Sequence, residues 1–110
     1  MKQYVIDQLR ESDYDQIMDY LQKHTEKTIL EGVYWVELPR ELLTAVQLEH
    51  TDCHPHYFAI NVNRNQAAFE LLIRSRQIMR CSCIDYANRE QRDHILRFAD
   101  NMLQQLNIKI

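Results

Sequence analysis

The chain has 110 residues, an apolar content of 45% and a formal net charge of −3, which describe one globular domain with a single core. The negative charge argues against broad nucleic-acid binding, which depends on excess positive charge, and no apolar run approaches the ~20 residues that span a membrane. A single glycine, Gly32, excludes the glycine-rich loops that hold phosphates, so we expect no nucleotide cofactor.

Two elements are predicted before Gly32. Residues 3–9 are rich in β-branched and aromatic side chains and predict a short strand. Residues 11–24 predict a helix with Ser12 as its N-cap. The apolar residues of this helix recur at i, i+3, i+4 and i+7, as Tyr14, Ile17, Met18 and Leu21.

The next elements are separated by turn and capping signals. Residues 33–39 predict a strand that Pro39 ends, and residues 40–50 predict a short helix or two helical turns. Within that helix, Thr44 followed by Gln47 resembles a capping box. The last helix begins with a similar pair, Asn88 and Gln91, and its apolar stripe extends for about four or five turns.

Between these helices we predict three antiparallel strands at residues 56–62, 67–74 and 78–84. Sorting the apolar residues onto one face sets the register, because a one-residue slip would turn each strand over. The predicted pairs are Phe58–Leu71, Ile60–Phe69, Ile73–Met79 and Arg74–Ile78. The predicted fold is therefore one α+β domain over residues 1–110, with the order β-α-β-α-β-β-β-α.

The same register assigns Cys81 and Cys83 to the core. On a strand, residues at i and i+2 share a face, and that face also carries Phe69 and Ile73. A disulfide between them would be badly strained. His56 would lie about 10 Å away across the sheet, too far to share a metal ion with either thiol.

A cluster of metal-ligand residue types lies in "EHTDCHPHYFA", residues 49–59, which holds three of the five histidines and one of the three cysteines. One hypothesis is a zinc-type site, with ligands drawn from a set of four. That set is His50, Cys53, His54 and His56. Another is a small enzyme that uses Cys53 as a nucleophile beside a histidine. The alternative to both is a helix-flanking His50, a semi-buried Cys53 and an edge His56.

The opposite face of the three strands combines apolar and arginine side chains, which are favoured at interfaces. Residues 60–84 hold four arginines and one acid, a net charge of +3, whereas residues 1–31 hold seven acids and four bases. The predicted interaction surface is Tyr57, Leu72, Arg74, Arg76, Ile78 and Arg80. It would receive a second copy of the chain, a helix or an anionic partner, unless the domain's own helices cover it. A non-enzymatic interaction module is thus the first functional hypothesis, ahead of metal binding and Cys53 catalysis.

Several stretches resemble a small family of bacterial proteins of unknown function: "GVYWVELPRELLT", "CHPHYFA", "ELLIRSRQIMRCSC" and "YANREQRDHI". The resemblance covers most of residues 32–95 and implies a free-standing bacterial protein of the cytoplasm, without implying an activity. An odd number of cysteines and a start that does not fit a signal peptide favour the same compartment.

Overall fold

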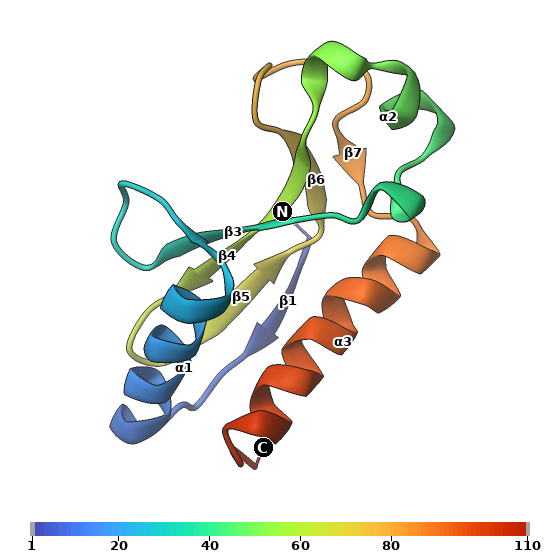
Figure 1. The fold of residues 1–110 in the computed structure, drawn as a ribbon. Helices are drawn as coiled ribbons and strands as arrows, with labels where there is room; N and C mark the ends of the chain where they lie inside the picture. The colour runs from blue at the N-terminus through green and yellow to red at the C-terminus, as the bar shows by residue number, and fades with distance from the viewer. Residues whose placement is uncertain (1, 110) are drawn as a thin grey trace.

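Helices and antiparallel strands combine in one α+β fold, which confirms the predicted class (Figure 1). The structure is a computed structural model and describes residues 2–109. Its helices and 3₁₀ turns are α1 (Glu11–His24), η1 (Arg40–Leu42), α2 (Ala45–Glu49), η2 (Thr51–Cys53) and α3 (Arg89–Gln105). Its strands are β1 (Gln3–Ile6), β2 (Glu26–Lys27), β3 (Val33–Glu37), β4 (His56–Val62), β5 (Ala67–Glu70), β6 (Leu72–Ser75) and β7 (Asp85–Tyr86).

The sheet runs in the order β1-β5-β4-β3-β2, and β6 pairs with both β4 and β7. Along β4, the residues Phe58 and Ile60 point to one face, because side chains alternate across a strand. The predicted pairing of Ile60 with Phe69 is confirmed. Phe98 of α3 lies against this face, with its ring 6.0 Å from that of Phe58.

Helix α1 packs on the same face of the sheet as α3. Tyr34 of β3 is buried and pairs with Ile60 of β4. Its hydroxyl lies 3.3 Å from the Met18 sulfur of α1. Ile17 and Leu21 of α1 join the same core. The opposite face, which carries Trp35 and Tyr57, therefore lies away from both helices; we call it the open face.

The start of α1 differs from the prediction. The helix begins at Glu11, and the Asp13 carboxylate accepts the backbone N–H of Arg10 at 3.0 Å. The Arg10 guanidinium bonds the same carboxylate at 3.1 Å. Ser12 as the N-cap is therefore wrong, because an acidic side chain inside the first turn satisfies the free backbone group instead.

The predicted pairing of Phe58 with Leu71 is also wrong. The strand is interrupted at Leu71, whose N–H donates to Lys2 and whose carbonyl accepts the N–H of Ala87 at 2.7 Å. Beyond this break β4 pairs with β6, with His56 opposite Ser75. The register shifts by two residues, an even number, so the faces of the sheet stay as predicted.

Residues 78–84 do not form the predicted strand, and the pairs Ile73–Met79 and Arg74–Ile78 are wrong. The Ser75 hydroxyl accepts the N–H groups of Gln77 and Ile78, each at 3.1 Å, and turns the chain away from the sheet. We call residues 76–84 the arm. In Figure 1 it rises beyond the end of β6 and passes close to η2 before it returns as β7.

Gly32 has a backbone conformation that residues with a side chain rarely adopt. Its φ is +78°, and a Cβ there would lie 2.5 Å from the carbonyl oxygen of Val62. Its carbonyl accepts the N–H of Val62 at 2.8 Å, which holds the β2–β3 turn against β4. Within residues 2–109, none of the helices is long and apolar enough to cross a membrane.

Candidate metal centre

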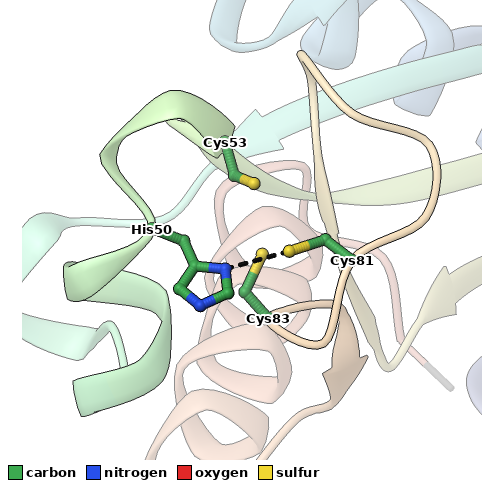
Figure 2. A group of neighbouring side chains, drawn as sticks. All are labelled: His50, Cys53, Cys81 and Cys83. Carbon is green, nitrogen blue, oxygen red and sulfur yellow. Dashed lines mark hydrogen bonds between the residues drawn. The ribbon is translucent and has the colours of Figure 1, made fainter.

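Four side chains that can ligate metals converge where η2 meets the arm (Figure 2). They are His50, Cys53, Cys81 and Cys83, and their ligand atoms all lie within 4.8 Å of one another. Cys53 and Cys83 are each 2% exposed, whereas His50 and Cys81 are half-buried. The cluster is thus sheltered on one side and open to solvent on the other.

The first two donors are held by the end of α2 and the η2 turn. The capping box of Thr44 and Gln47 that starts α2 is confirmed. The helix ends at Glu49 and is capped by His50, whose carbonyl accepts the N–H of Cys53 at 2.9 Å. This turn places the side chains of His50 and Cys53 on the same side of the chain, and both point toward the arm (Figure 2).

The other two donors share a tight turn in the arm. The Cys81 carbonyl accepts the N–H of Ile84 at 3.0 Å. The Cys83 backbone N–H lies near enough to the Cys81 sulfur to lower the pKa of the Cys81 thiol. A spacing that would be strained for a disulfide on a strand therefore suits two ligands of one ion when the chain turns.

Hydrogen bonds stabilise the thiolate form of Cys81. Those from the Cys83 backbone and side chain contribute most, followed by one from His50, whose Nδ1 lies 2.9 Å from the Cys81 sulfur. Together they lower the pKa of Cys81 to about 6. A thiolate is the form of cysteine that binds a metal ion.

Burial has the opposite effect on Cys83 and raises the pKa of its thiol to about 12, with smaller contributions from the Cys81 and Cys53 thiols. The Cys83 sulfur lies 3.3 Å from Nε2 of His56. A cation bound beside it would remove the cost of the negative charge, because a coordinating thiol is deprotonated outright.

His56 is fully buried, and burial lowers its pKa, with His54 and His50 adding to the shift. Its Nδ1 has no hydrogen-bond partner among the described residues. A buried unpaired acceptor is more readily tolerated than a buried unpaired donor, which favours the proton on Nε2. In this tautomer Nε2–H donates to the Cys83 sulfur. His56 therefore holds one of the four clustered metal-ligand side chains in place and is not itself a member of that cluster.

His54 faces another way. Pro55 favours an extended backbone at this residue, and its φ of −70° and ψ of 149° have that form. Its Nε2 lies 2.6 Å from the carbonyl oxygen of Gln47. Of the four residues in the sequence hypothesis, the structure thus brings together His50 and Cys53, places His56 behind Cys83 and turns His54 toward α2.

A buried amide network positions the arm against the helices. Gln47 donates from its Nε2 to the Cys83 carbonyl at 3.2 Å. Its Oε1 accepts from Nε2 of Gln91 at 2.9 Å. Gln91 belongs to the capping box that starts α3, which is confirmed. The two capping boxes and the turn that carries Cys83 are therefore parts of one hydrogen-bonded unit.

Cys81 and Cys83 do not lie on the core face of a strand, because residues 78–84 form none; Cys83 is buried as predicted, whereas Cys81 is only half-buried. The predicted separation of about 10 Å between His56 and these thiols is also wrong. Both errors follow from treating residues 78–84 as a strand. Ile78 and Met79 are both apolar but would point to opposite faces of a strand. Alternation of apolar and polar residues was therefore weak evidence for a strand in this segment. The sequence feature that could have indicated Cys81 and Cys83 as ligands was the presence of two cysteines separated by a single residue.

Only some residues of the predicted interaction surface lie next to one another. Tyr57 pairs with Arg74 on the open face, where they line a cavity with Arg76 and Ile78. Leu72 pairs with Tyr86 of β7, and Arg80 is exposed in the arm. The alternative that helices α1 and α3 cover this surface is not what the packing shows.

The donor set has a definite chemistry. Three cysteines and one histidine form a common tetrahedral zinc set, and four protein ligands leave no open position for a substrate. Comparisons with family models, curated proteins and solved structures found no match to the chain.

Proposed function

We propose that the protein is a metal-binding domain that holds one zinc-type ion through His50, Cys53, Cys81 and Cys83. The observation that carries the proposal is the convergence of four ligand atoms within 4.8 Å from two segments far apart in the chain. The ion would fasten the arm to η2, a structural role that agrees with a fully protein-ligated site.

The distances support a tetrahedral ion. Zinc bound at about 2.3 Å from sulfur and about 2.0 Å from nitrogen places neighbouring donors about 3.5–4 Å apart. The widest pair, at up to 4.8 Å, would close slightly, and the His50 Nδ1–Cys81 sulfur pair, now 2.9 Å apart, would open slightly. The ligand type favours the same ion, because soft thiolate ligands select zinc over magnesium or calcium.

The cysteine-enzyme hypothesis has less support. Cys53 is 2% exposed and lies among other ligand atoms, so a substrate has little access to its sulfur. The more exposed thiol is Cys81, and its neighbours are those of the proposed centre. The geometry therefore supports a ligand role for Cys53 better than a nucleophilic one.

The proposal is tested by elemental analysis of untagged protein purified under reducing conditions. We expect one zinc per chain. Cobalt(II) substituted for zinc should give the sulfur-to-metal charge-transfer absorption of a tetrahedral thiolate site. Cys83→Ser should lower both signals, whereas Ser82→Ala, in the same turn, should leave them intact. Absence of stoichiometric zinc, iron or nickel, together with no cobalt signal, would reject the proposal.

A second candidate function is a non-enzymatic interaction module that uses the open face. It is supported by the exposure of Met79, at 91%, and Ile78, at 37%, beside a sheet face that lies away from both helices. Such apolar side chains rimmed by arginines are typical of interfaces. Light scattering over a range of concentrations tests whether a second copy is the partner, and Met79→Lys should then abolish the association. A strict monomer would reject the homodimer.

A further inference from the structure

A cavity of about 330 Å³ opens on the open face, beside the arm. Its lining includes Trp35, Tyr57, Arg74, Arg76, Ile78 and Met79. The volume lies at the lower end of small-molecule pockets, which hold roughly 300–1,000 Å³. It lies outside the cluster of metal-ligand side chains.

The floor of the cavity is aromatic. The rings of Trp35 and Tyr57 have centroids 4.7 Å apart and an interplanar angle of 36°. The guanidinium carbon of Arg76 lies 4.8 Å from the centre of the Trp35 ring. These spacings are direct contacts that leave no room for a third flat group between the planes, so a ligand ring would stack on Trp35 in place of the Arg76 guanidinium.

The charges on the cavity favour an anion. Its lining contains two arginines, Arg74 and Arg76, and no acidic residue. Arg74 is paired with Glu70 at 3.2 Å, so Arg76 is the arginine that a ligand would engage. Arg76 pairs with Glu26 at 2.7 Å in a solvent-exposed ion pair, and such pairs contribute little net stability. A ligand carboxylate can therefore replace Glu26, and guanidinium–carboxylate hydrogen bonds are among the strong ones.

The arm connects this cavity to the candidate metal centre. Ile78 and Met79 border the cavity, and Cys81 and Cys83 follow in the same nine-residue segment, 76–84. The arm is held at its start by Ser75, whose hydroxyl donates to the Cys53 carbonyl at 2.6 Å. An ion bound to the two thiols would fix the far part of the arm to the same η2 turn.

We propose that this cavity binds a small aromatic carboxylate, with its ring over Trp35 and its charge on Arg76, and that the metal centre strengthens this binding by holding the arm in place. The second half of the inference rests on the proposed function. The two sites are then linked: metal raises the affinity for the carboxylate, and the carboxylate raises the affinity for metal by the same factor.

The cavity is tested with benzoate as the probe and benzamide as its neutral counterpart. Trp35 is the only tryptophan, so its indole N–H signal in a nitrogen–proton correlation spectrum reports on the floor of the cavity. In zinc-loaded protein, benzoate should shift this signal and bind about tenfold more tightly than benzamide, the difference that a charge-assisted hydrogen bond supplies. Equal binding of the two, or an unmoved signal, would overturn the assignment.

Variants locate the carboxylate. Arg76→Gln should weaken benzoate about tenfold and leave benzamide unchanged. Arg64→Gln is the matched control, because Arg64 is exposed and lies in the loop between β4 and β5, near Glu11. If Arg76→Gln has no effect, or if the chain self-associates through this face and benzoate does not compete, the small-molecule assignment is wrong.

The linkage is tested by repeating the benzoate titration after chelation of the metal. Affinity should fall by about fivefold or more, the usual size of such couplings, and saturating benzoate should tighten zinc binding by the same factor. Zinc that binds one per chain without changing benzoate affinity overturns the linkage and leaves the proposed function standing. If no zinc binds, the linkage falls with the proposed function, while the benzoate comparison still decides the cavity.

Discussion

His56 is buried behind the proposed centre, and the proton that it presents to the Cys83 sulfur gives it a role in metal affinity. His56→Phe removes this donor, and outer-shell partners of metal ligands are typically worth 10–100-fold in affinity, so we expect zinc to bind about 10–100-fold more weakly. The stoichiometry should stay at one, as measured by competition with a chromophoric chelator. His56→Gln, which can still present an N–H, should recover much of the loss.

Two results would contradict this role for His56. Loss of stoichiometric zinc in the Phe variant would make His56 a ligand, as the sequence hypothesis proposed. An unchanged affinity would mean that the contact with Cys83 gives no support. His24→Phe, at the exposed end of α1, is the matched control.

Cys81 makes the stability of the metal-free protein depend on pH. Its folded pKa is about 6, below the ordinary value of 9.0, so the folded state favours the thiolate. The stabilisation is present above the ordinary pKa and is lost as the pH falls through the folded pKa. The free energy of unfolding should therefore rise with pH between these two values.

Urea unfolding with chelator and a reducing agent measures this slope. Cys81→Ser should flatten it. Cys83, whose pKa is raised to about 12, acts in the opposite direction and only as the pH rises above its ordinary value of 9.0. A slope that persists in Cys81→Ser would assign it to another group.

At the scale of elements, Gln47 joins α2, α3 and the arm. Its Oε1 accepts from Thr44 at 3.0 Å and from Gln91 at 2.9 Å, and its Nε2 donates to Cys83. Gln47→Met leaves these buried groups without partners, at about 1–3 kcal/mol for each such group. We expect the free energy of unfolding to fall by about 2–3 kcal/mol, measured by urea unfolding.

The exposed Gln105 of α3 offers the control, and Gln105→Met should change stability by less than about 0.5 kcal/mol. Gln47→Met should also weaken zinc binding, because the turn that carries Cys83 loses its anchor on α2. Unchanged stability in Gln47→Met would show that water replaces the lost partners.

For the whole molecule, a metal that ties the arm to η2 links zinc binding to folding. Above the dissociation constant, each tenfold increase in free zinc should raise the free energy of unfolding by about 1.4 kcal/mol. Urea unfolding in a series of zinc buffers gives this slope. Cys53→Ser should remove most of it, and stability that is independent of zinc in the unaltered chain would contradict the link.

Local pattern was enough to predict most of the elements from the sequence. Helix α1, strand β4 and both capping boxes depend on residues close together in the chain, whose spacing or polarity is visible directly. The pairing of Ile60 with Phe69 could also be predicted, because the loop between their strands is short and the apolar residues must share one face.

The route of the arm was decided by tertiary structure. A strand over residues 78–84 satisfied alternation, but the Ser75 hydroxyl ends β6, and hydrogen bonds from Gln47 to Cys83 and between His50 and Cys81 hold the arm near η2. The bonds from Gln47 to Cys83 and between His50 and Cys81 join residues 36 and 31 positions apart. The sequence by itself determined the α+β class and two of the four clustered donors, His50 and Cys53. Only the tertiary structure brought Cys81 and Cys83 to them, because that meeting depends on long-range polar contacts that no local period encodes.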